Sequence, residues 1–96
     1  MKVVYTAAAQ NELRDIGEWL AAHYPVVAPR VGRRIHDVVA HIARWPESAP
    51  RSAGREGVRV VPLGHYPYKI FYRLTADTVE ILHIHHAARQ PWDEQA

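Results

Sequence analysis

The sequence contains no cysteine, so neither disulfide bonds nor thiolate chemistry can contribute to its structure or function. Its two serines, Ser48 and Ser52, lie in a stretch with prolines and a glycine, which argues against a Ser-His-Asp catalytic triad. It also lacks a glycine-rich phosphate-binding loop. No apolar run approaches the roughly 18 residues that span a bilayer, and the N-terminus lacks the apolar core of a signal peptide. We therefore expect a cytoplasmic protein with no membrane partner.

What the chain does contain is ordinary apolar content and an excess of arginine. Its 96 residues, 48% of them apolar, predict a single domain over residues 1–96 with one modest core. Such a core leaves little room for a deep small-molecule pocket, so function at a surface or through a partner is favoured. Ten of the 12 basic residues are arginine, which suits forked contacts with phosphate or carboxylate, although an arginine-rich proteome gives the same bias. The net charge of +2 is too small to indicate non-specific nucleic-acid binding.

Hydrophobic periodicity predicts two amphipathic helices after a short strand at residues 2–5. Thr6 is a good N-cap for a first helix over residues 7–23, and prolines separate this helix from a second one that ends before Pro46. Acidic residues, Glu12 among them, are expected on the outer faces of the first helix. The predicted buried stripes are Ala9, Leu13, Ile16 and Leu20 in the first helix and Val31, Ile35, Val38, Ile42 and Trp45 in the second.

Three further strands are predicted at residues 58–63, 68–74 and 78–85, and the tight turns between them imply an antiparallel meander. The order of elements is therefore β-α-α-β-β-β. Two amphipathic helices joined by a short link must bury their apolar stripes against one face of the sheet. We predict an α+β domain of two layers, with the helical hairpin on one face of a mainly antiparallel sheet and the first strand beside the meander.

The opposite face of the sheet is expected to carry cations. Alternation along residues 68–74 places Lys69, Phe71 and Arg73 on the face that no helix covers, and Arg59 on the preceding strand could join them. Three cations around one phenyl ring would suit nucleic acid or an acidic peptide. An ordinary solvated sheet face, with long basic side chains lying over apolar atoms, remains the alternative.

Histidines cluster at the end of the last strand. His83 and His85 project to one side of the strand, while His86 points to the other side or lies beyond it. A His-x-His pair can ligate zinc, but a site needs three or four ligands, and no second tight cluster of His, Asp or Glu is visible. We therefore expect neither a metal nor another cofactor. A histidine beside Arg89 could instead act as general acid or base in RNA cleavage; the alternative is polar capping of a sheet edge.

Three segments, taken in this order, resemble the RelE/ParE superfamily of bacterial toxins. They are Gly57-Val-Arg59 opening one strand, Tyr68-Lys-Ile-Phe-Tyr-Arg73 on the next, and His86-x-x-Arg89-x-Pro-Trp92 after the last. The likeness covers nearly the whole chain. It implies a growth-inhibiting toxin of a type II toxin–antitoxin module, located in the cytoplasm and held inactive in a hetero-oligomer with a cognate antitoxin.

The superfamily divides between toxins that cut messenger RNA on the ribosome and ParE-like toxins that inhibit DNA gyrase. In this sequence Gly64 stands where the nucleases carry a catalytic arginine, and Pro91 and Trp92 stand where a tyrosine would follow the second arginine, Arg89. These departures favour a ParE-like inhibitor that is not an enzyme. The alternatives are a ribosome-dependent nuclease using Arg59, His86 and Arg89, and a binding module without toxicity.

On the favoured interpretation, the residues that carry function are contacts to a large partner. The partner would be gyrase or the antitoxin, and on the nuclease alternative the ribosome and its messenger RNA. The predicted interface residues are Arg59, Lys69, Phe71, Arg73, His83, Arg89 and Trp92.

Overall fold

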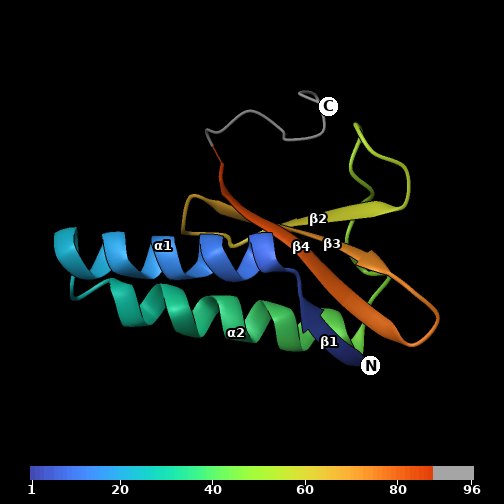
Figure 1. Ribbon diagram of the computed structural model, residues 1–96, viewed down its shortest axis with the longest axis horizontal. Helices are drawn as coiled ribbons and strands as arrows, with labels where there is room; N and C mark the ends of the chain where they lie inside the picture. The colour runs from blue at the N-terminus through green and yellow to red at the C-terminus, as the bar shows by residue number, and fades with distance from the viewer. Residues whose placement is uncertain (88–96) are drawn as a thin grey trace.

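Two helices lie side by side against one face of a four-stranded sheet (Figure 1). The structure is a computed structural model, and it describes residues 1–87. Its elements are β1 (Lys2–Tyr5), α1 (Ala7–His23), α2 (Ala28–Arg44), β2 (Val58–Pro62), β3 (Tyr68–Leu74) and β4 (Thr78–His86). The predicted α+β class and the β-α-α-β-β-β order are confirmed. No helix in this part of the chain is long and apolar enough to cross a membrane.

The helices begin and end where local chemistry predicts. The Thr6 hydroxyl accepts a hydrogen bond from the Ala9 N–H at 3.1 Å, which satisfies one of the free N–H groups at the start of α1. At the other end the Tyr24 N–H still donates to Leu20, and the next residue is Pro25. Pro29 lies in the first turn of α2, where its missing N–H costs nothing.

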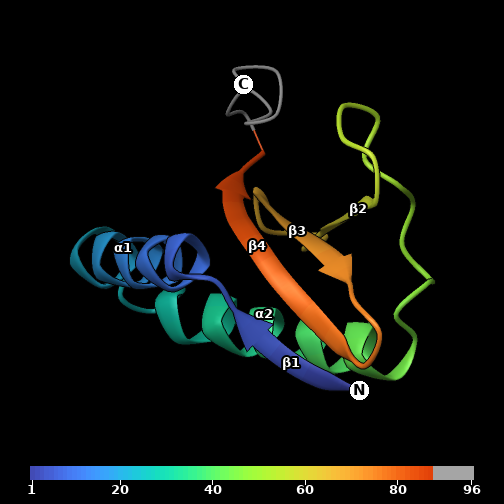
Figure 2. The ribbon, with the colours of Figure 1, turned by 45° about the vertical axis from the view of Figure 1, so that its right-hand side comes forward.

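The sheet has the strand order β1-β4-β3-β2, with β1 parallel to β4 and the other pairs antiparallel. Figure 2 shows both helices on the same side of this sheet. The predicted helix-facing set of β3 is confirmed: Tyr68, Ile70 and Tyr72 are buried in the core, and Leu74 packs against it. From β4 the core receives Val79, Ile81 and Ile84.

Most of the predicted helical stripes enter this core, with one exception. Ala9, Leu20 and four residues of the α2 stripe are buried, and Leu13 and Ile16 pack against them. The exception is Trp45, which we expected in the stripe. It follows the last residue of α2 as the C-cap, leaves the helical direction, and is 55% exposed.

Candidate functional site

Arg59 lies on the helix-facing side of the sheet, which corrects the expectation that it joins the cations of the opposite face. It pairs with Tyr72 across β2 and β3, and directly opposed residues of an antiparallel pair point to the same face. Its guanidinium donates to the carbonyl of Ala49 at 2.7 Å and to that of Glu47 at 3.3 Å, and the side chain is only 15% exposed. Arg59 therefore holds the loop that follows α2.

Tyr72 supports the same loop from the neighbouring strand. Its hydroxyl donates to the carbonyl of Pro46 at 2.7 Å. Burial raises the pKa of the Tyr72 phenol, and the nearby Arg59 charge and a backbone hydrogen bond with Ala49 oppose that rise. The predicted candidate Arg59 thus belongs to a structural clamp under the residue 46–50 loop.

The opposite face of the sheet does carry Lys69, Phe71 and Arg73, as predicted, but it is not an open cationic surface. Phe71 is 4% exposed, with its ring centroid 5.5 Å from that of His85. Arg73 donates from Nε and Nη2 to one oxygen of Glu80, at 2.9 and 2.7 Å. This pairing follows from register, because Glu80 lies opposite Arg73 on β4. Arg73 is therefore paired with an acidic residue of the same sheet.

His86 lies at the far end of the sheet from Arg59. It pairs with Tyr68, whereas Arg59 pairs with Tyr72, so four residues of β3, about 13 Å of strand, separate the two positions. The imidazole of His86 stands edge-on to the Tyr68 ring, with centroids 5.5 Å apart. Two of the three residues that a nuclease would need are therefore not brought together. The third, Arg89, lies outside the described residues, as does Trp92.

Gly64, the residue that stands in place of a nuclease arginine, occupies a left-handed turn. Its φ is +75°, a conformation that residues with a Cβ rarely adopt. An ideal Cβ at this position would lie 3.7 Å from Nη2 of Arg34, which is ordinary contact. The backbone, rather than crowding, therefore favours glycine here.

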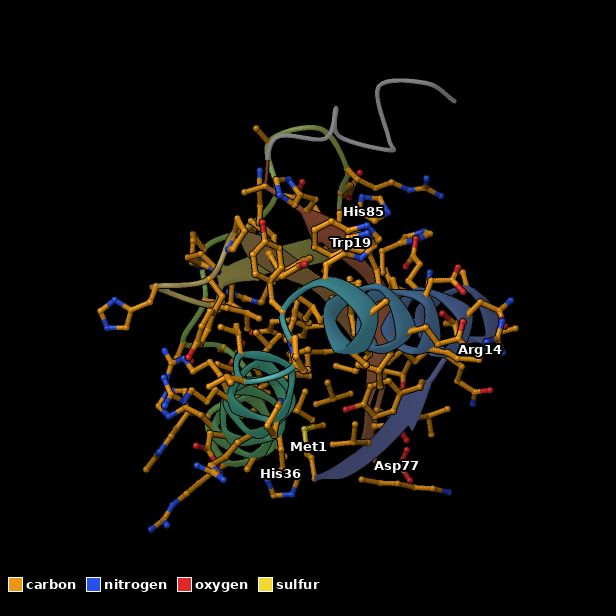
Figure 3. The ribbon with its side chains drawn as sticks, turned by 90° about the vertical axis from the view of Figure 1, so that its left-hand side faces the viewer. Met1, Arg14, Trp19, His36, Asp77 and His85 are labelled. Atoms are coloured by element: carbon orange, nitrogen blue, oxygen red, sulfur yellow. The ribbon has the colours of Figure 1, made fainter. Side chains whose placement is uncertain are left out.

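An apolar groove of about 630 Å³ lies where the two helices meet the end of the sheet. In Figure 3 Trp19 lies on α1 beside this end, and it is 50% exposed. Burial raises the pKa of the Tyr68 phenol, as expected beside apolar neighbours. The groove is lined by Asp15, Ile16, Trp19, Leu20, Tyr24, Val27, Val31, Tyr66, Pro67, Tyr68 and His86.

A basic groove of about 550 Å³ adjoins the apolar one, and Tyr66 lines both. Three arginines of α2 contribute to it, together with Asp37 and the turn that holds Gly64 and His65. Arg34 is fixed by donating from Nε to the Leu63 carbonyl at 3.1 Å. The arginines are Arg30, Arg33 and Arg34. The molecule thus presents an apolar surface and a cationic surface side by side.

Glu12 is the residue that sequence reasoning missed. We expected it on the outer, acidic face of the first helix, but its carboxylate turns toward β4 and is partly buried. It lies 3.2 Å from Nδ1 of His83 and 3.0 Å from Nε2 of His85, and it accepts the Ile84 N–H at 3.0 Å. His83 and His85 do share one side of β4, as predicted, but the third member of the group comes from α1.

This contact arises because β1 is shorter than β4. β1 pairs with β4 only as far as Ile81, so the later edge of β4 has no strand partner. There α1 takes over: the Thr6 hydroxyl donates to the Leu82 carbonyl at 2.9 Å, and Glu12 accepts from Ile84. A register shift opposite Phe71 sets the positions of the residues that follow Leu82. No local sequence pattern indicates such an edge contact.

Comparison with known proteins agrees with the fold. The family model described as the ParE toxin of the type II toxin–antitoxin system parDE matches residues 3–91. The chain belongs to the ParE toxin family. It is 35% identical to the candidate toxin Y4kP of Sinorhizobium fredii (strain NBRC 101917 / NGR234) over 89 residues, which are 93% of this chain and 91% of that protein. The resemblance to the RelE/ParE superfamily, and to its ParE-like branch, is confirmed.

A solved structure shares the ParE-family fold. It is a chain of the chromosomal ParDE TA system from P. aeruginosa, which superposes with a TM-score of 0.78 at 23% identity. The match covers 90% of this chain and 95% of that one. The helical hairpin and the four-stranded sheet are thus a shared architecture.

Proposed function

We propose that this ParE-family protein inhibits growth by binding DNA gyrase, without cutting RNA, and that a cognate antitoxin neutralises it. The observation that favours gyrase over the ribosome as target is the distance between the candidate nuclease residues Arg59 and His86. Arg59 clamps a loop near one end of β3, and His86 lies beside the other end. A nuclease needs its acid or base and its charge-stabilising group around one phosphate.

Gly64 supports the same choice. The resemblance to the superfamily implies that its nucleases carry an arginine at this point, whereas the turn here has a positive φ. An arginine would have to adopt a strained backbone to occupy it. The part of the chain that the structure describes thus favours inhibition through protein contact.

Induction in a bacterial host separates the two targets. We expect plasmids to lose negative supercoiling while messages remain intact at codons occupying the ribosomal A site. The chain carrying Arg59→Lys should behave like the parent if it folds to the same extent, because Arg59 acts here as a structural residue. Cleavage of messages during translation, with supercoiling unchanged, would contradict the gyrase assignment.

We propose that the antitoxin binds in the two adjoining grooves. Membership of a toxin–antitoxin family supplies the class of partner, and the solved relative comes from a ParDE TA system. The apolar groove offers exposed rings from Trp19 and Tyr24 that an apolar side chain would cover. The neighbouring arginines add charge that acidic side chains would complement.

Because the two grooves adjoin, they constrain the sequence of a segment that could bind both. Because Tyr66 lines both grooves, one continuous segment can reach the apolar groove with one part and the α2 arginines with the next. We therefore propose an antitoxin segment in which large apolar residues lie next to a group of Asp or Glu. Isolated rim charges would mainly speed association, while the apolar contacts would limit dissociation.

A further inference from the structure

We propose that Glu12, His83 and His85 form a binding site for a divalent transition-metal ion, with zinc as its simplest occupant. One carboxylate and two imidazoles are the donor set of zinc sites that have three protein ligands. Each residue presents one donor atom, and the three atoms lie within 4.8 Å of one another. This site is separate from the two grooves assigned to the antitoxin.

The two donor separations that involve the Glu12 carboxylate are close to those of a metal centre. With zinc–ligand bonds of 2.0–2.1 Å in a tetrahedron, ligand atoms are separated by about 3.3 Å. Oε2 of Glu12 lies 3.2 Å from Nδ1 of His83 and 3.0 Å from Nε2 of His85. The imidazole rings have centroids 4.8 Å apart and are tilted by 48°. Small rotations of the rings would bring all three donors around one ion.

The scaffold holds the donors from two directions. His83 and His85 are two residues apart on β4, so both project from the same side of the strand. Glu12 approaches from α1 and is fixed by the Ile84 N–H, which donates to Oε1 at 3.0 Å. A carboxylate oriented by a backbone hydrogen bond is a typical feature of protein metal sites.

Burial and access are also suited to a metal. His85 is 4% exposed, while Glu12 and His83 are partly exposed, so the cluster lies at the edge of the protein interior. A cavity of about 290 Å³ is lined by His83, alone among the three donors, and also by Arg55 and Arg73. Three protein donors would leave a fourth position for water. A metal binds only imidazole nitrogen atoms that carry no proton, so Nδ1 of His83 and Nε2 of His85 would bind the ion unprotonated.

Zinc titration of the full chain by calorimetry tests this site, with matched variants on the same elements. We expect one zinc ion per chain in the wild type and a loss of affinity of at least about 100-fold in Glu12→Gln and His83→Gln, beyond the 10–100-fold typical of changes to outer-shell residues. The controls Glu18→Gln, exposed on α1, and His36→Gln, which projects from α2 away from the sheet (Figure 3), should bind like the wild type.

Two further readouts keep the result interpretable. Glutamine at position 12 can still accept the Ile84 N–H, and His83 is partly exposed, so circular dichroism should show both variants folded. Cobalt in place of zinc should give the visible absorption of a four-coordinate site in the wild type alone. Zinc binding unchanged in Glu12→Gln and His83→Gln, or no binding by the wild type, would overturn the proposal and leave the cluster as a hydrogen-bond network only.

Discussion

Arg59 shows how a candidate functional side chain can be a structural one. Arg59→Ala removes the donor to the Ala49 carbonyl and leaves that acceptor without its present partner. We expect the free energy of unfolding to fall by about 1–3 kcal/mol in urea denaturation. The exposed Arg14→Ala is the matched control and should stay within about 0.5 kcal/mol of the parent. Equal stability of both variants would contradict the clamp.

Tyr72 makes the stability of the protein fall as pH rises in the alkaline range. Its phenol has a raised pKa in the folded chain because it is buried. Above the ordinary pKa of 10.0 the unfolded chain releases this proton first, so the folded state binds more protons and the free energy of unfolding falls as pH rises. This contribution is complete below that pKa and is lost as pH passes the raised one.

Tyr72→Phe should therefore flatten the alkaline decline, measured as urea midpoints from about pH 8 upward. Tyr5 and Tyr68, whose pKa values burial also raises, will leave part of the slope. At neutral pH the variant should lose about 1 kcal/mol with its hydrogen bond to the Pro46 carbonyl. An equal flattening by Tyr24→Phe, which removes an exposed phenol, would argue against this assignment.

At the scale of elements, the start of α1 combines two functions in one side chain. The Thr6 hydroxyl accepts from Ala9 as the N-cap and donates to Leu82 at the edge of β4. Thr6→Ala should therefore cost about 2 kcal/mol, the upper end for a cap, in thermal or urea unfolding. Thr75→Ala, in the exposed turn between β3 and β4, should cost much less. If the two variants were equally stable, the link between α1 and β4 would contribute little.

Elements were predictable from the sequence because each has a local cause. The Thr6 cap, the prolines around α2 and the alternation of β3 act over a few residues, and the observed bounds follow them closely. Trp45 was misplaced because helical spacing alone does not show where a helix ends. Glu12 could not be placed correctly because its partners, His83 and His85, lie more than 70 residues away, and β4 exposes them to it only where β1 stops pairing.

In the whole molecule, the charged residues on the two faces of the sheet are not arranged as alternation along single strands predicts. The set of residues on each face of β3 was predictable, but the register of β2 against β3 was not, and it moves Arg59 to the helix side. Register likewise supplies Arg73 with its partner Glu80. The cationic surface beside the apolar groove comes instead from arginines of α2. The sequence contains these arginines but does not indicate that they lie next to the turn at residues 64–66.

Substitution of two tryptophans of similar exposure tests the proposed binding site of the antitoxin. Trp19 lines the apolar groove, whereas Trp45 lies at the end of α2 outside it. We expect Trp19→Ala to weaken antitoxin binding by about 2 kcal/mol, roughly 30-fold, in calorimetry or surface plasmon resonance. Trp45→Ala should bind within a few-fold of the parent. A larger loss of antitoxin affinity for Trp45→Ala than for Trp19→Ala would place the binding site outside the groove.

A supercoiling assay with purified gyrase and relaxed plasmid DNA tests directly whether the protein inhibits gyrase. Adding the purified protein should inhibit ATP-dependent supercoiling in proportion to its concentration, and an equimolar amount of the antitoxin should restore it. Translating ribosomes programmed with a defined message should show no cleavage under the same concentrations. Full supercoiling in the presence of the protein, together with cleavage of the message, would contradict inhibition of gyrase.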